Sequence, residues 1–332
     1  MPEQKPHAAF RRRRRRDLLI AAAGLVVVVI AAGTVYLTSD IRAVNSQTAP
    51  QTALPGIVSS APRSLRQVWS QPSDAAAGST ASARGIVVTT DEHTVIGRDP
   101  ETGAQRWVYG RSNRNLCAVA STDLDRDDTN GVSGIIAVYR HGDLCQEVVT
   151  LDPRTGERLY QRTTPGAVDG ELVTGGPYAG WLGPDLLDLW RSQLVRTYEY
   201  GNQSASPEAN SGHTGCTFLD AAVTNQQFAT IERCPQQGST LRLNLNWADP
   251  HDHDDKYSSW SSKPRAEFDT GATAARIVGI TQDRVAVLVN APATALVVYD
   301  ADGSVVSRTA TAVPDDVFGV DGPTPRVTLD DV

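Results

Sequence analysis

The sequence predicts an all-β protein, a β-propeller of four-stranded blades, behind a single N-terminal transmembrane helix. Three observations support this prediction. An aliphatic run near the N-terminus is long enough to cross a bilayer. The rest of the chain consists of short apolar segments separated by turn residues, without the pattern of an amphipathic helix. One of these segments recurs with its turn at a spacing of about one blade.

The aliphatic run comprises the 20 uncharged residues from Leu18 to Leu37. A helix of this length is roughly 30 Å long, the thickness of a bilayer's hydrocarbon core. Lys5 and Arg11–Arg16 precede it, whereas Asp40 and Arg42 are the charged residues just after it. The positive-inside bias therefore predicts a single-pass plasma-membrane protein with a cytoplasmic N-terminus. A cleavable signal peptide is the nearest alternative, but its apolar region is usually about 7–15 residues long.

We divide the chain into a basic cytoplasmic tail (1–17), the transmembrane helix (18–38), a flexible linker (39–63) and an extracytoplasmic propeller domain (64–332). The linker is rich in Ser, Thr, Ala and Pro, a composition that cannot bury an apolar face of its own. Beyond residue 38 the chain has 24 basic and 36 acidic residues. This acidic balance argues against a nucleic-acid partner, and the expected partners are the membrane and a protein of the cell envelope.

Nine short runs in the domain have the alternating polarity and the flanking turn residues of strands. They are residues 85–90, 94–99, 105–110, 134–139, 146–152, 157–162, 284–290, 295–300 and 304–313. The corresponding blades are predicted at 83–111, 115–164, 168–201, 215–268 and 274–313. The residues after 313 begin another blade and stop, so the sequence predicts either a small, irregular ring or a chain without a C-terminal piece.

A repeated hairpin carries the propeller prediction. GRDPETGAQRWVYG (97–110) returns as TLDPRTGERLYQR (150–162) and, in a weaker form, as VYDADGSVVSR (298–308). In each copy an aspartate precedes the turn and a glycine ends it, so the aspartate can accept turn N–H groups and the glycine can adopt a positive φ. The aspartates are Asp99, Asp152 and Asp300, and the glycines are Gly103, Gly156 and Gly303.

The motif D-x-x-T-G followed by Trp or Tyr resembles the repeat of quinoprotein-type (pyrroloquinoline quinone-like) β-propellers. The resemblance implies that Trp107 and Tyr160 pack between blades, and that Trp69 belongs to an outer strand that closes the ring. Of the 31 basic residues 28 are arginine, a bias typical of GC-rich bacteria such as actinobacteria. We therefore expect a membrane-anchored bacterial member of this group.

Function is predicted less directly. The quinoprotein dehydrogenases that the repeat resembles hold their cofactor with an adjacent, disulfide-bonded Cys-Cys pair, which this sequence lacks. We therefore expect no quinone cofactor, assign no catalytic residue and do not expect an enzyme. The expected function is a protein-interaction or assembly scaffold in the cell envelope. The alternative is a ligand- or carbohydrate-binding module, or an enzyme, that uses the axial funnel.

All four cysteines lie beyond the predicted helix, where disulfides persist. Sequential pairing, Cys117 with Cys145 and Cys216 with Cys234, is the simplest of three connectivities and places each link within one blade. No C-x-x-C spacing indicates a redox or metal site.

Two segments carry candidate metal ligands. Residues 121–131 have carboxylates at alternate positions, Asp123, Asp125 and Asp127, as calcium loops do. No glutamate stands at the twelfth position, and an acidic loop between strands explains the same residues. His251 and His253 alternate within an acidic, proline-containing run, which fits either a transition-metal site or a solvated loop.

Overall fold

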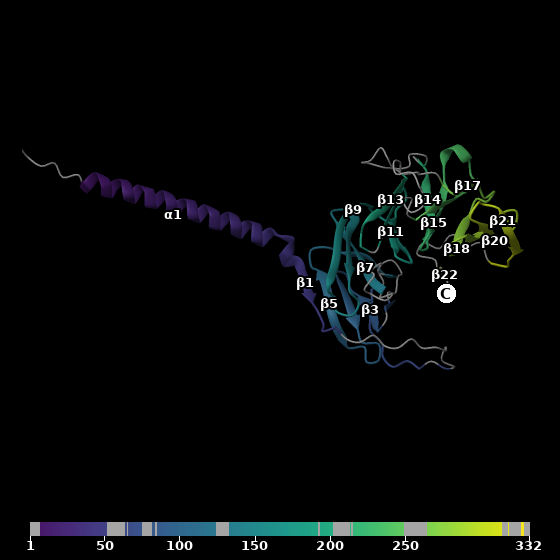
Figure 1. The fold of residues 1–332 in the computed structure, drawn as a ribbon, viewed down its shortest axis with the longest axis horizontal. Helices are drawn as coiled ribbons and strands as arrows, with labels where there is room; N and C mark the ends of the chain where they lie inside the picture. The colour runs from purple at the N-terminus through teal and green to yellow at the C-terminus, as the bar shows by residue number, and fades with distance from the viewer. Residues whose placement is uncertain are drawn as a thin grey trace, which may run out of the picture.

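The computed structural model describes residues 7–51, 64, 66–74, 82–83, 85–123, 133–191, 193–201, 213, 215–248, 264–313, 318 and 327–328. These residues form one long helix and five sheets, each built on four antiparallel strands that are consecutive in the chain (Figure 1). This is the blade architecture of a β-propeller, and the predicted fold class is confirmed.

The blades follow one another in chain order. Blade 1 contains β2 (Ser82–Ala83), β3 (Ile86–Thr90), β4 (Thr94–Arg98) and β5 (Gln105–Arg111). Blade 2 contains β6 (Leu116–Asp123), β7 (Ser133–His141), β8 (Leu144–Leu151) and β9 (Arg158–Ala167). Blade 3 contains β10 (Glu171–Gly175), β11 (Tyr178–Leu182), β12 (Leu186–Arg191) and β13 (Arg196–Gly201).

The last two blades have the same order of strands. Blade 4 contains β14 (Thr217–Val223), β15 (Gln227–Arg233), β16 (Arg242–Trp247) and β17 (Ala266–Asp269), with the short 3-10 helix η4 (Pro235–Gln237) after β15. Blade 5 contains β18 (Ala275–Ile280), β19 (Arg284–Val289), β20 (Ala295–Asp300) and β21 (Val305–Ala310). A two-residue strand, β22 (Val327–Thr328), pairs in parallel with β18.

Four clusters of buried side chains fill the spaces between neighbouring blades. Trp107 belongs to the cluster between blades 1 and 2, Trp190 to that between blades 2 and 3, Phe228 to the next and Ile277 to the last. Burying one large apolar side chain contributes about 1.5–3 kcal/mol, so these clusters hold each blade against the next. Among the described residues no such cluster joins blade 5 to blade 1, and in Figure 1 the blades run in sequence from β5 to β21.

The repeated hairpins have the turn that the sequence predicts. Asp99, Asp152 and Asp300 each accept a backbone N–H from their own turn. The glycines that end the first two turns, Gly103 and Gly156, have φ values of +72° and +74°. A residue with a Cβ is strained in this left-handed region, which explains the glycine in each copy.

Trp107, on β5, docks on the hairpin turn of the next blade. Its Nε1 donates to the carbonyl of Pro153 at 2.7 Å, and a Cβ added at Gly156 would lie 2.7 Å from the indole. The glycine is therefore required by close approach as well as by its φ. Tyr160 packs against the cluster between blades 2 and 3. The predicted packing of both aromatic residues between blades is confirmed.

Trp69 makes the same contact with blade 1 but lies outside any strand. Its Nε1 donates to the carbonyl of Pro100 at 2.9 Å, and its ring covers Gly103. The prediction that it belongs to an outer strand is wrong, because β1 (Val44–Gln47) already pairs with the outer edge of β5. Residues 66–74 run past blade 1 without forming a strand or a helix.

The helix α1 (His7–Thr38) leads directly into blade 1. Its segment Arg16–Leu37, with a mean hydropathy of 2.7, is long and apolar enough to cross a membrane, and none of it is buried against the rest of the protein. The 3-10 helix η1 (Asp40–Ala43) follows after one residue, and β1 follows η1. Figure 1 shows α1 extending away from the sheets.

This junction differs from the flexible linker predicted over 39–63. Residues 40–47 are a 3-10 helix and an edge strand, and β1 pairs with β5 from Val44 opposite Arg111 to Gln47 opposite Val108. Backbone pairing with an open sheet edge stabilises β1, although its side chains do not alternate in polarity. Residues 52–63 of the predicted linker lie outside the described residues.

Both disulfides have the sequential pairing. Cys117 and Cys145 are joined across the end of blade 2, with Cα atoms 6.1 Å apart, and Cys216 and Cys234 across the end of blade 4, with Cα atoms 4.1 Å apart. Cys216 and Cys234 flank the paired residues Thr217 and Arg233 of adjacent strands. Cys117, by contrast, lies on β6 and Cys145 on β8, with β7 between these strands, so this link spans three strands rather than two.

We expect peptide mapping of the unreduced protein to recover these two links and no free thiol. Each closed loop contributes roughly 3 kcal/mol in the chain-entropy model, so reduction should lower the thermal midpoint while circular dichroism still reports β structure. A crossed link between blades 2 and 4 would contradict these blade boundaries.

Candidate functional site at the junction of the helix and the propeller

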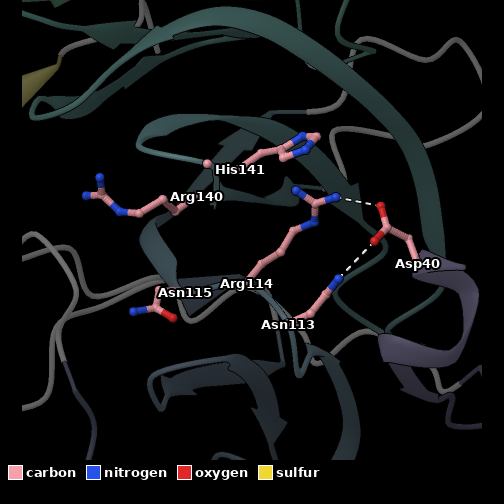
Figure 2. Close-up of a pocket in the computed structure, with 7 residues that line it drawn as sticks. Asp40, Asn113, Arg114, Asn115, Arg140 and His141 are labelled. Carbon is pink, nitrogen blue, oxygen red and sulfur yellow. Dashed lines mark hydrogen bonds and ion pairs between the residues drawn. The ribbon is translucent and has the colours of Figure 1, made fainter. Parts of the chain in front are cut away.

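A polar cavity of about 310 Å³ lies where the chain passes from η1 into the propeller (Figure 2). Three elements supply its walls: η1, the connection between β5 and β6, and the end of β7 with its turn. Its lining residues are Asp40, Asn113, Arg114, Asn115, Arg140, His141 and Gly142. The cavity therefore joins the residues next to the apolar helix to the first two blades.

Asp40, on η1, is a hydrogen-bond acceptor at one side of the cavity. Its Oδ2 lies 2.5 Å from Nη2 of Arg114, and its Oδ1 accepts a hydrogen bond from Nδ2 of Asn113 at 2.8 Å, as Figure 2 shows. These two hydrogen bonds lower the pKa of the Asp40 carboxyl below its usual value. Asp40 is thus held as a carboxylate that ties η1 to the β5–β6 connection.

Behind this wall lies a buried ion cluster. Glu147, on β8 and 3% exposed, pairs with Nη1 of Arg111 and, at 2.9 Å, with Nε of Arg114. Gln161 donates to the same carboxylate at 2.6 Å. With Asp40, whose side chain is exposed at the cavity wall, two arginines and two carboxylates balance in charge. Because buried charges are tolerated when paired and hydrogen-bonded, the cluster fixes η1, blade 1 and blade 2 in one arrangement.

The rim of the cavity offers hydrogen-bond donors. Arg140 donates to the carbonyls of Asp143 at 2.6 Å and Val168 at 3.1 Å, and its side chain is partly exposed. His141 and Asn115 also lie at the rim (Figure 2). Chemically, this arrangement can clamp the chain and receive a polar group of a partner. It does not bring a nucleophile and a base together among the lining residues.

Of the predicted metal ligands, Asp123 alone lies among the described residues. Asp123 ends β6, is exposed, and its N–H donates to the carbonyl of Gly176 at 3.0 Å. Asp125 and Asp127 lie outside the described residues, as do His251 and His253. The calcium site therefore stays a prediction.

A second buried group, at Asp188 on β12, was not anticipated. Its Oδ2 accepts from Nε1 of Trp190 at 2.8 Å and its Oδ1 lies 2.9 Å from Nε of Arg196. Burial raises the pKa of the Asp188 carboxyl from 3.8 to about 6, against the opposing effect of these two partners. The sequence signal was a single aspartate inside the apolar strand LLDLWR.

This shift predicts a pH dependence of stability. Since the folded-state pKa is raised, the folded state favours protonated Asp188, and its stability falls as the pH rises from about 4 through 6. A rise of the Asp188 pKa from 3.8 to about 6 corresponds to about 3 kcal/mol of folding free energy. The variant Asp188→Asn cannot titrate, so its stability relative to the parent should improve by an amount of this order between pH 3.5 and 7. Urea unfolding of parent and variant at the two pH values measures this change. The prediction is contradicted if the difference in free energy of unfolding between variant and parent is the same at both pH values.

The chain is similar to known proteins in its fold but not in its sequence. No protein-family model matches the chain, and no curated protein sequence matches it. Among solved structures, BBS1N in complex with ARL6DN aligns at 9% identity and a TM-score of 0.43, over 71% of this chain and 68% of that one. The Pan2 WD40 domain of Neurospora crassa aligns at 11% identity and a TM-score of 0.40, over 67% and 61%.

BamB from Moraxella catarrhalis aligns at 13% identity and a TM-score of 0.36, over 70% of this chain and 74% of that one. The chain is a β-propeller. This class follows from the order and pairing of its own strands, since identities of this size are too low to transfer an activity.

Proposed function

We propose that the protein is a membrane-anchored scaffold whose propeller binds a protein partner of the cell envelope, and that it is not an enzyme. One observation carries the proposal: a single residue, Ser39, separates the apolar helix α1 from η1, and β1 directly continues η1 as an edge strand of blade 1.

Hydrogen bonds along this connection hold it against the first two blades and limit the motion of the propeller relative to the helix. Beyond the pairing of β1 with β5, the N–H of Ser112 donates to the carbonyl of Ala43, and the N–H of Ala49 donates to the carbonyl of Thr155 in blade 2, both at 2.9 Å. With the Asp40–Arg114 pair, these bonds hold η1 and β1 against blades 1 and 2, and Ser39 is the one residue between η1 and α1. So short a connection restricts the orientation of the propeller on the helix, which favours docking of a partner in the same membrane because little orientational freedom is lost on binding.

The test is crosslinking in native membranes followed by capture of the full-length protein. We expect a defined membrane complex whose yield falls severalfold when a flexible Gly/Ser segment is inserted after Ser39. The matched control is the same insertion at Gly271, where the β17–β18 connection has open space. Equal yields from both insertions would refute a role for the short connection, and a glycan or quinone that copurifies would favour the ligand-binding alternative.

The scaffold also requires the orientation that the charges predict. Reporter fusions after Leu37 should be active only when the reporter works outside the cytoplasm, and neutral residues in place of Arg11–Arg16 should weaken this orientation. A cytoplasmic reporter that is active behind the propeller would contradict it.

A further inference from the structure

Four potential metal ligands converge at the end of the β14–β15 hairpin. They are Nδ1 of His213, Oε2 of Glu232 and the sulfurs of the Cys216–Cys234 disulfide. The potential ligand atoms of His213, Cys216 and Glu232 all lie within 4.8 Å of one another. All four residues are at most 5% exposed. Thiolate sulfur, imidazole nitrogen and carboxylate oxygen are the ligands that zinc takes in proteins, and four of them match its tetrahedral coordination once the sulfurs are thiolates.

A positively charged nitrogen stands among these atoms. Nη2 of Arg242, on β16, lies 2.8 Å from Nδ1 of His213, 3.1 Å from Oε2 of Glu232, and 3.4 and 2.9 Å from the sulfurs of Cys216 and Cys234. One guanidinium nitrogen thus touches all four potential ligands. This is the place that a bound cation would take.

In the disulfide-bonded state, the two hydrogen bonds of Nδ1 of His213 exclude each other. Its Nδ1 lies 2.8 Å from Nη2 of Arg242, which can only donate, and 2.8 Å from the carboxylate of Glu232. A ring nitrogen that accepts from the arginine carries no proton to donate to the glutamate, and one that donates to the glutamate cannot accept. A metal ion bonded to both His213 and Glu232 would remove this conflict.

We propose that His213, Cys216, Glu232 and Cys234 form a zinc site when their disulfide is reduced. A dithiol reductant supplies two electrons and two protons, becomes a disulfide itself and leaves two thiols. Binding of Zn²⁺ then releases these two protons to water, because thiolates are the ligands. Arg242 withdraws from the centre and keeps its existing pair with Glu267 through Nη1.

The surroundings already support the glutamate as a ligand. Its other oxygen, Oε1, accepts from Nδ2 of Asn244 and, at 3.2 Å, from Oγ1 of Thr230. Such outer contacts orient a ligating carboxylate. The other disulfide provides a natural comparison, since Cys145 belongs to the apolar cluster between blades 2 and 3 and Cys117 packs against it.

The test measures zinc bound by the full-length protein in detergent. The protein is reduced with a phosphine, incubated with ZnCl₂, desalted without oxygen and analysed for metal per chain. We expect one zinc per reduced chain and none per oxidised chain. The control variant Cys117→Ser/Cys145→Ser should keep the zinc, whereas Cys216→Ser/Cys234→Ser should lose it.

Two further measurements separate a site from a structural role. His213→Ala should weaken zinc binding at least about tenfold, whereas Arg242→Gln should strengthen it because the competing cation is gone. Co²⁺ in place of zinc should give the visible bands of a tetrahedral, thiolate-ligated ion. A reduced chain that keeps its β circular dichroism but binds no zinc overturns the proposal. So does a chain that unfolds on reduction and is not refolded by zinc.

Discussion

Replacing Trp107 with alanine is expected to lower the free energy of unfolding by about 3–5 kcal/mol, the range for removing a large aromatic side chain from a core. Trp107 is fully buried between blades 1 and 2, and its indole donates to Pro153. The variant therefore leaves a cavity at the interface and an unpaired carbonyl. Urea unfolding followed by circular dichroism measures the loss.

Trp69 provides the matched control. It makes the same contact one blade earlier, over Gly103 and with the carbonyl of Pro100, but it is only partly buried. Trp69→Ala should therefore cost much less than Trp107→Ala. Equal losses would mean that the hydrogen bond, rather than burial between blades, provides the stability.

A Cβ at Gly156 would meet the Trp107 ring at 2.7 Å, so Gly156→Ala should also destabilise the interface between blades 1 and 2.

The repeat made the blades predictable. In blades 1 and 2 an aspartate, a glycine with positive φ and an aromatic residue occur at the same offsets within the hairpin, and blade 5 keeps the aspartate and the glycine, so a copy specifies its own turn and, where the aromatic residue is present, a contact between blades. Blades 1, 2 and 5 carry such hairpins, and the sequence predicts the last three strands of each of them, but not the first strands β2, β6 and β18. Blades 3 and 4 lack a clear copy, and there only the blade limits were predicted.

The junction and the buried clusters were not predictable in the same way. β1 reads VNSQ, which has no alternation, and the open edge of β5 rather than its own sequence makes it a strand. Arg111 and Glu147 are 36 positions apart, and Glu232 meets Arg242 across two paired strands. Such pairs depend on strand register. The polarity pattern determines which face of the sheet a side chain lies on, but not which residue of the neighbouring strand it meets. For the buried charges, the usable signal was a charged residue within an apolar strand.

Glu147 is where the second large effect is expected. Glu147→Ala removes the carboxylate that pairs with Nη1 of Arg111 and Nε of Arg114, both of which are almost completely buried. Breaking a buried ion pair from one side leaves an uncompensated charge and costs about 3–5 kcal/mol. Asp40 reaches Arg111 only at 3.8 Å and does not replace Glu147 there.

The matched control for this prediction is Glu157→Ala, an exposed glutamate in the hairpin turn of the same blade, which should change stability by no more than about 0.5 kcal/mol. The double variant Arg111→Met/Glu147→Met tests the physical cause. Because it removes both charges and Arg114 keeps its pair with Asp40 at 2.5 Å, it should be less destabilised than Glu147→Ala alone. If the double variant loses as much free energy of unfolding as Glu147→Ala, or more, the loss comes from packing at the junction and the buried charge is not its cause.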